Sequence, residues 1–215
     1  MATAGRACRR GVQEVALLAV SKTFGPDAVR EACAAGQRAF GENYIQEAVE
    51  KMALLADLPI EWHCIGPIQS NKTRLVATHF AWAHTVDRLK IAERLSAQRP
   101  PELPPLQVCI QVNVDGGANK SGVAPGEALA LARAVAALPR LTLRGLMSIP
   151  ELAPDFEAAR AVHMRARALF YHMNAAGLGL DTLSLGMSAD LEAAIAAGGT
   201  LVRVGSAIFG LRDGG

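Results

Sequence analysis

The sequence is poor in aromatic residues and in net charge. Aromatic side chains make up 5% of the 215 residues, and 22 lysines and arginines nearly balance 20 aspartates and glutamates. A chain this close to neutral, with no lysine–arginine block longer than Arg9-Arg10, gives little support for nucleic-acid binding. Apolar residues account for 51%, but no apolar run is long enough to cross a bilayer. We expect a folded globular protein that binds neither nucleic acid nor membranes.

Cysteine is also scarce. Cys8, Cys33, Cys64 and Cys109 are widely spaced and form no C-x-x-C pair. This spacing favours free, mostly buried thiols in a reducing compartment over a disulfide framework. The first ten residues contain no apolar stretch of signal-peptide length, so the cytoplasm is the expected location.

Short apolar runs alternate along the chain with longer segments of helical periodicity. The expected strands are Val15–Val20, Arg38–Phe40, Glu61–Ile65, Trp82–Val86, Gln107–Val112, Thr142–Met147, Thr182–Leu185 and Leu201–Val204. Seven or eight helices are expected between them, and the expected helical stretches include Asp27–Ala35, Ile45–Ala56, Ile91–Ala97, Glu127–Ala137, Phe156–Ala176 and Ala189–Ala197. Continuously apolar strands indicate a parallel sheet that is covered on both faces. Eight of them in this length predict an α/β fold, a single (β/α)8 barrel.

A doubly wound open sheet is the alternative architecture. Such folds carry a glycine-rich turn after the first strand, but here that turn reads Ser21–Phe24, and no suitable G-x-G-x-x-G occurs. The proline-rich segment 100–105 is short, and the strand–helix rhythm resumes directly after it. We interpret this segment as a surface loop and expect one domain over residues 1–215.

Barrel enzymes carry their functional residues at the C-terminal ends of the strands, and Lys22 closes the first expected strand. Desolvation lowers the pKa of a lysine and makes its neutral amine available for a Schiff base. The alternative is the commoner fate of a lysine at a strand end: the stem is buried and the ammonium reaches water.

The loops after the last two expected strands are suited to binding phosphate. Gly186–Ser188 is expected to lead into a helix at Ala189, which would place N–H groups and a serine hydroxyl at the positive end of a helix dipole. Gly205 and Ser206 supply a second small turn, and barrels frequently hold phosphate between these two loops. Ordinary N-cap and turn roles are the alternative, but a barrel favours phosphate binding.

Arg203 lies inside the last expected strand, where a charge is costly unless it is paired or liganded. It either forms an ion pair with a neighbouring carboxylate or points inward at a ligand.

The five histidines form no metal-ligating pattern, with His63 alone, and no G-x-S-x-G, P-loop or H-E-x-x-H motif occurs. Glu42 and Asp87 give weak support for a glycosidase carboxylate pair.

Several motifs follow one another in a fixed order. They are Ala19–Thr23, Phe40–Glu47, Trp62–Gly66 with Gln69–Lys72, Leu183–Asp190 and Val202–Gly210. These segments span about Val15 to Phe209 and resemble the YggS/PROSC family of pyridoxal 5′-phosphate homeostasis proteins. The chain departs from the family's pattern at Phe24, where a second lysine is usual, and at Pro67, where a histidine is usual.

The resemblance implies a fold type III barrel of the alanine-racemase type, with pyridoxal 5′-phosphate carried as an aldimine on Lys22. It also implies that Arg203 faces the pyridine nitrogen. The other residues that it assigns are Ser188, Gly205 and Ser206 for the phosphate, Asn43 and Met187 in the cofactor pocket, and Lys120 as a second lysine that handles the cofactor.

An arginine at the ring nitrogen has a chemical consequence. It can donate a hydrogen bond but cannot stabilise a pyridinium, so the electron-sink action of the cofactor is blunted. The expected function is therefore to carry the cofactor in intracellular vitamin B6 homeostasis, without robust turnover. The expected partners are pyridoxal phosphate itself and apo-enzymes that depend on it, and the expected state is a monomer.

Two other functions stay open from the sequence. An amino-acid racemase-like enzyme would use the same residues with an added acid/base group, for which Tyr44 is the nearest tyrosine. A phosphate-sugar barrel enzyme would need only the last two loops.

Overall fold

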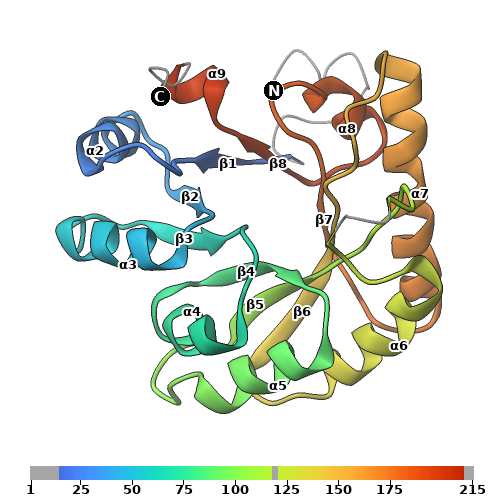
Figure 1. Cartoon of the computed structure of the whole chain (residues 1–215), viewed down its shortest axis with the longest axis horizontal. Helices are drawn as coiled ribbons and strands as arrows, with labels where there is room; N and C mark the ends of the chain where they lie inside the picture. Colours follow the sequence, from blue (N-terminus) through green and yellow to red (C-terminus); the bar gives the residue numbers. More distant parts are fainter. Residues whose placement is uncertain (1–14, 118–120, 211–215) are drawn as a thin grey trace.

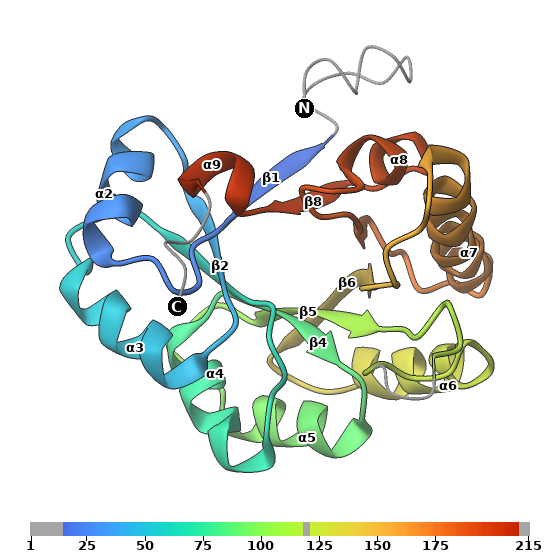
Figure 2. The same cartoon turned by 45° about the horizontal axis from the view of Figure 1, so that its top comes forward.

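The computed structural model describes residues 15–117 and 121–210. Its strands form a closed parallel barrel in chain order, with β8 paired to β1, which confirms the (β/α)8 prediction. The strands are β1 (Ala16–Val20), β2 (Ala39–Glu42), β3 (Glu61–Cys64), β4 (Trp82–Val86), β5 (Leu106–Gln111), β6 (Leu141–Met147), β7 (Thr182–Ser184) and β8 (Leu201–Val204). Figures 1 and 2 show these strands at the centre and the helices around them.

The helices lie between successive strands. They are α2 (Pro26–Ala34), α3 (Ile45–Leu54), the 3-10 helix η2 (Ser70–Lys72), α4 (Thr73–His79), α5 (Leu89–Gln98), α6 (Pro125–Ala136), α7 (Phe156–Ala175), α8 (Leu191–Ala196) and α9 (Ser206–Phe209). Pro26 and Pro125 lie in the first turns of α2 and α6. Proline lacks a backbone N–H, but an N–H at this position has no acceptor within the helix, so no hydrogen bond is lost. The Asp155 carboxylate caps α7 by accepting the N–H of Ala158 at 2.8 Å.

Two local expectations were wrong, one for β2 and one for α8. The short helices α4 and α9 add to the helical stretches named from the sequence; the β-branched residues of α4, among them Thr73 and Val76, weaken its helical signal. Strand β2 runs two residues further than expected, to Glu42. Helix α8 begins at Leu191 and not at Ala189, because Ser188–Asp190 form a turn.

Side chains alternate between the barrel interior and the helix layer. In β1, Ala19 packs in the main core under the helices, whereas Leu18 and Val20 pack with Ile65 and Leu201. In β8, Val202 and Val204 pack with Ile195 of α8, so Arg203 between them points into the barrel. The strand period of two therefore decides which polar groups reach the interior.

The described cysteines, Cys33, Cys64 and Cys109, are buried and free, as expected. Within residues 15–117 and 121–210, no helix combines the length and apolar character that crossing a membrane requires.

Candidate functional site

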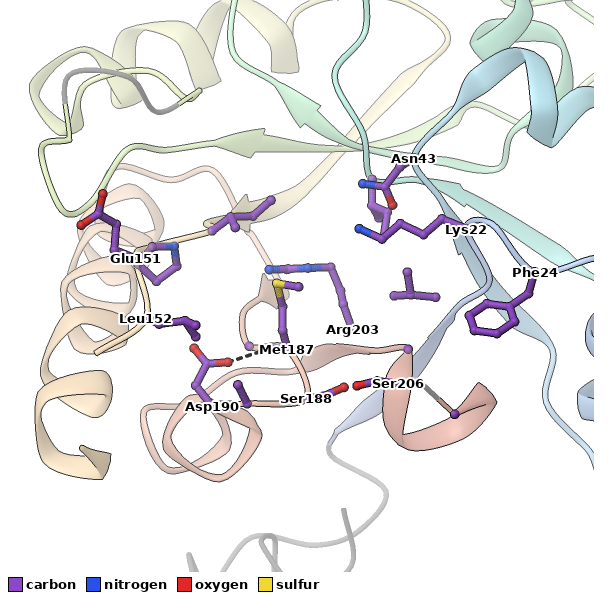
Figure 3. Close-up of a pocket in the computed structure, with 18 residues that line it drawn as sticks. Lys22, Phe24, Asn43, Glu151, Leu152, Met187, Ser188, Asp190, Arg203 and Ser206 are labelled. Carbon is purple, nitrogen blue, oxygen red and sulfur yellow. Dashed lines mark hydrogen bonds between the residues drawn. The ribbon is translucent and has the colours of Figure 1, made fainter. Parts of the chain in front are cut away.

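A cavity of about 1040 Å³ lies at the C-terminal end of the barrel. Its wall comes from the residues that follow β1, β2, β3, β6, β7 and β8, together with Val20 inside β1 and Arg203 inside β8. It is lined by Val20, Lys22, Phe24, Asn43, Ile65, Ile149, Pro150, Glu151, Leu152, Gly186, Met187, Ser188, Ala189, Asp190, Arg203, Gly205, Ser206 and Gly210. Figure 3 shows Lys22 and Asn43 on one wall and Glu151 and Leu152 across from them.

The structure brings most of the expected site residues together. Those that line this single cavity are Lys22, Asn43, Met187, Ser188, Arg203, Gly205 and Ser206. The remaining candidate, Lys120, lies outside the described residues.

Lys22 reaches the cavity because of the alternation in β1. Val20 faces the interior, the next side chain, Ser21, turns outward and is fully buried, and Lys22 returns to the interior side. The Ser21 hydroxyl donates to the Glu42 carboxylate at 2.7 Å, and the Ser21 carbonyl accepts a hydrogen bond from Lys51 at 2.9 Å. Thr23 adopts φ of +66°, an uncommon conformation for a β-branched residue, and its N–H donates to Glu47 at 3.2 Å. The backbone on both sides of Lys22 is thus held in place.

Arg203 is almost completely buried, at 3% exposure. Its Nη1 donates to the Ser184 hydroxyl at 2.7 Å and its Nη2 donates to the Ser148 carbonyl at 2.9 Å. Within the part of the chain that the structure describes, no carboxylate lies within ion-pair distance of it. Burial lowers the pKa of Arg203 to about 10, so it stays charged at neutral pH. Of the two roles expected for Arg203, the structure supports the one that faces a ligand cavity.

The loop after β7 is built around a glycine and an aspartate. Gly186 has φ of +86°, and an added Cβ would lie 2.4 Å from the Ala194 Cβ. The Asp190 carboxylate accepts the Met187 N–H at 2.8 Å and a hydrogen bond from His163 Nε2 at 2.7 Å (Figure 3 draws the first). Burial opposes ionisation of Asp190, but these hydrogen bonds hold its pKa below the usual value.

Ser188 does not stand at a helix start, which corrects the expectation for this loop. It lies in the turn that precedes Asp190, whereas Ser206 is the first residue of α9 and Gly205 is its N-cap. The first N–H groups of a helix have no partner within it, so those near Ser206 are the better placed for an anion. In Figure 3 the hydroxyls of Ser188 and Ser206 point toward each other.

Other expected chemistry lies elsewhere. Glu42 is buried against Lys51, and Asp87 accepts the N–H of Gly122 at 3.2 Å, so neither forms a carboxylate pair in the cavity. Tyr44 is 53% exposed and is not part of the cavity wall. No group of three or more histidines, cysteines or acids among residues 15–117 and 121–210 could hold a metal ion.

Part of the cavity wall was not predicted from the sequence. Ile149–Leu152 line the cavity, and their position shortly after β6 is the signal that would have indicated it. Phe24 stacks on Phe209 with ring centroids 5.0 Å apart, which ties the loop after β1 to α9. Asn43 Oδ1 is buried without a hydrogen-bond partner.

Comparisons with known proteins agree with this geometry. Residues 4–213 match the family model of the alanine racemase N-terminal domain. The chain is 62% identical over 212 residues to a pyridoxal phosphate homeostasis protein of Pseudomonas aeruginosa, covering 99% of this chain and 91% of that protein. It is 54% identical over 218 residues to the protein of the same name from Escherichia coli K12, covering 99% and 92%.

Solved structures give the same picture. PipY of Synechococcus elongatus with pyridoxal phosphate bound superposes with a TM-score of 0.85 at 37% identity, over 97% of this chain and 98% of that one. Alanine racemase from Corynebacterium glutamicum superposes with a TM-score of 0.71 at 20% identity, over 98% of this chain and 60% of that one, which shows a shared fold alone.

Proposed function

Because this chain belongs to the alanine racemase N-terminal domain family and, within it, to the pyridoxal phosphate homeostasis proteins, we propose that it binds pyridoxal 5′-phosphate and acts in intracellular vitamin B6 homeostasis. One observation carries this proposal. A lysine amine, a buried guanidinium and two serine hydroxyls, from Lys22, Arg203, Ser188 and Ser206, line one cavity.

The donor set of the cavity fits the cofactor. When bound, pyridoxal phosphate supplies an aldehyde that condenses with a primary amine, and a pyridine ring that withdraws electrons. Lys22 Nζ would hold the aldehyde carbon, and Arg203 would donate to the ring nitrogen. Asn43 Oδ1, which is buried and without a partner, would gain a donor. The residues assigned to the phosphate are Ser188, Gly205 and Ser206, with Met187 beside them.

Arg203 supports the role of a carrier over that of an enzyme. A guanidinium that is charged at neutral pH donates to a ring nitrogen but does not leave a proton on it, so carbanion chemistry is poorly supported. Tyr44, the acid/base group that a racemase-like reaction would recruit, lies outside the cavity wall. We propose that the protein acts in the cytoplasm as one barrel domain and as a monomer, without robust turnover, and that pyridoxal phosphate-dependent apo-enzymes receive its cofactor.

The visible spectrum of the purified protein tests cofactor binding. Incubation with pyridoxal phosphate is expected to give a yellow absorption band, and borohydride reduction followed by peptide mass mapping is expected to place the adduct on Lys22. Lys22→Ala should abolish both signals, whereas Lys90→Ala, at an exposed position on α5, should leave them unchanged. A colourless wild-type protein, or an adduct confined to other lysines, would contradict the proposal and favour the phosphate-sugar enzyme.

A chiral assay separates the carrier from the racemase-like alternative. The loaded wild-type protein is incubated with L-alanine, and the D-enantiomer is measured against free pyridoxal phosphate as the control. We expect no rate above that control. Sustained conversion at many turnovers per protein molecule would establish an enzyme.

A further inference from the structure

A continuous chain of hydrogen bonds runs through the interior of the barrel and ends on Arg203. The Glu61 carboxylate contacts His63 Nε2 at 2.8 Å, and His63 Nδ1 contacts His84 Nε2 at 2.8 Å. His84 Nδ1 then contacts the Ser184 hydroxyl at 2.9 Å, and that hydroxyl accepts from Arg203 Nη1 at 2.7 Å. This series of hydrogen bonds, called the relay below, links side chains of β3, β4, β7 and β8. The sequence predicts no histidine contact between these strands.

The charge states of the histidines fix the direction of every bond. Burial lowers the pKa of His63 and lowers that of His84 well below its ordinary value, so both rings are neutral. The hydrogen bond from His63 lowers the pKa of Glu61, so its carboxylate is ionised and can only accept. His63 must then donate through Nε2 and accept at Nδ1.

The donor and acceptor roles of His84 and Ser184 follow in the same way. His84 donates through Nε2 to His63 and accepts at Nδ1, so the Ser184 hydroxyl donates to it and accepts from Arg203. One tautomer of each ring, with the proton on Nε2, satisfies all four bonds. Every donor points from the guanidinium toward the carboxylate, an arrangement in which hydrogen bonds strengthen one another.

Packing holds the two rings in this orientation. The Trp82 ring stacks on His63 with centroids 5.1 Å apart and an interplanar angle of 9°. The Arg144 guanidinium lies over Trp82 at 4.7 Å and is itself paired with Asp181 at 2.8 Å. The Asp190 carboxylate and the buried thiol of Cys109 also lie near Arg203.

We propose that Glu61, His63, His84 and Ser184 are positioning residues that orient the Arg203 guanidinium toward the cofactor ring and couple its charge to the Glu61 carboxylate. The proposal rests on the proposed function, because it concerns how Arg203 meets the ring nitrogen. Glu61 begins β3, at the opposite end of the barrel from the cavity, so the relay connects the cofactor site to that end.

Substitutions along the relay test it, with pyridoxal phosphate as the ligand. Ser184→Ala removes the bond next to Arg203, and His84→Leu removes the two central bonds. Each is expected to shift the visible band of the loaded protein and to raise the cofactor dissociation rate. For Ser184→Ala, which deletes a hydrogen bond to the charged guanidinium, the expected rise is about tenfold.

Conservative variants separate orientation from packing. His84→Asn keeps an acceptor for Ser184 and should retain most of the wild-type spectrum, whereas Glu61→Gln keeps the acceptor but removes the charge and should shift the band slightly. Ser96→Ala is the matched control, because the buried Ser96 hydroxyl on α5 donates to the Pro139 carbonyl, away from the barrel interior. Its band and dissociation rate should equal those of the wild type.

Nitrogen-15 chemical shifts of the cofactor-free protein give an independent readout. They should place the proton on Nε2 of both His63 and His84. A proton on Nδ1 of either ring, or a band and dissociation rate of Ser184→Ala and His84→Leu equal to those of Ser96→Ala, would overturn the relay. A wild-type protein that forms no adduct on Lys22 would instead overturn the proposed function, and the tautomers would still decide the hydrogen-bond chain.

Discussion

Lys51 Nζ lies 2.6 Å from Glu42 Oε1 inside the protein, with the two side chains 4% and 0% exposed. The same ammonium donates to the Ser21 carbonyl at 2.9 Å, directly before Lys22 in the chain. This buried ion pair therefore fixes the end of β1 at the point where the cofactor would be attached. Burial raises the pKa of Glu42, and the Lys51 ammonium opposes that shift.

Removing Lys51 is expected to destabilise the protein strongly. Lys51→Met leaves the Glu42 carboxylate buried without its cation, and breaking a buried pair in this way costs about 3–5 kcal/mol. Chemical denaturation with urea measures the change. The control is Arg30→Ala, which breaks the exposed Arg30–Asp57 pair and should leave the denaturation midpoint almost unchanged. Equal midpoints for the two variants would contradict this role of Lys51.

Stability is expected to fall as the pH drops below 6.5, the ordinary pKa of histidine. Burial holds the pKa values of His63 and His84 below that value in the folded state, so the unfolded chain binds more protons in this range. The unfolding free energy should therefore decrease with acidification, by at most about 1.4 kcal/mol per pH unit for each of these histidines. Urea titrations at several pH values measure the slope.

His84→Asn should remove about half of the acid slope that His63 and His84 together cause. His172→Asn, which replaces an exposed histidine on α7, should leave that slope as it is. An identical slope in wild type and His84→Asn would show that the pKa of His84 is the same in the folded and unfolded states and would contradict this prediction.

The sequence predicts the barrel because each strand is a short apolar run followed by helix signals. It also predicts the cavity wall from Lys22 and Arg203, since both positions follow from strand alternation and from the place of barrel sites at one rim. What it does not predict are contacts between strands that are distant in the sequence. His63 contacts His84 from the neighbouring strand β3, but Ser184 of β7 reaches the same histidine only because the sheet closes into a barrel.

The buried cation in α3 has a signal in the sequence. Ile45, Ala48 and Lys51 are the buried residues of this helix, and their spacing of three places them on one face. A lysine on an otherwise apolar face indicates a buried partner, which here is Glu42. The late start of α8 has no such signal. The Asp190 carboxylate accepts the N–H of Met187, and the turn that this bond closes takes the place of the first helical turn.

The thiols of Cys64 and Cys109 are expected to be inert in the folded protein. Burial raises the pKa of each to about 12, and both are fully buried. Iodoacetamide at pH 8 should label neither cysteine in native protein and both in urea, as read by peptide mass mapping. Rapid native labelling of either one would show that the barrel wall opens locally.

Gly186→Ala is expected to weaken cofactor binding by distorting the loop after β7. The substitution combines a left-handed φ of +86° with a Cβ placed 2.4 Å from the Ala194 Cβ, so the loop that carries Ser188 must move. Gly177→Ala is the matched control, since Gly177 has φ of +91° but no atom within 4 Å of the added Cβ. Both variants should lose stability, but only Gly186→Ala should raise the dissociation constant for pyridoxal phosphate.

The Asp190 carboxylate is expected to keep the same loop in its binding conformation. In Asp190→Ala the Met187 N–H and His163 Nε2 lose their shared acceptor, and the pyridoxal phosphate dissociation rate should rise about tenfold, as for the loss of a hydrogen bond to a charged group. Asp190→Asn keeps an oxygen for Met187 and should have a smaller effect. Asp155→Ala deletes a carboxylate–amide bond of equal length at the start of α7, outside the cavity wall, and should leave dissociation unchanged. If Asp190→Ala releases the cofactor no faster than Asp155→Ala, the loop holds its shape without this carboxylate, and Gly186 alone sets the position of Ser188.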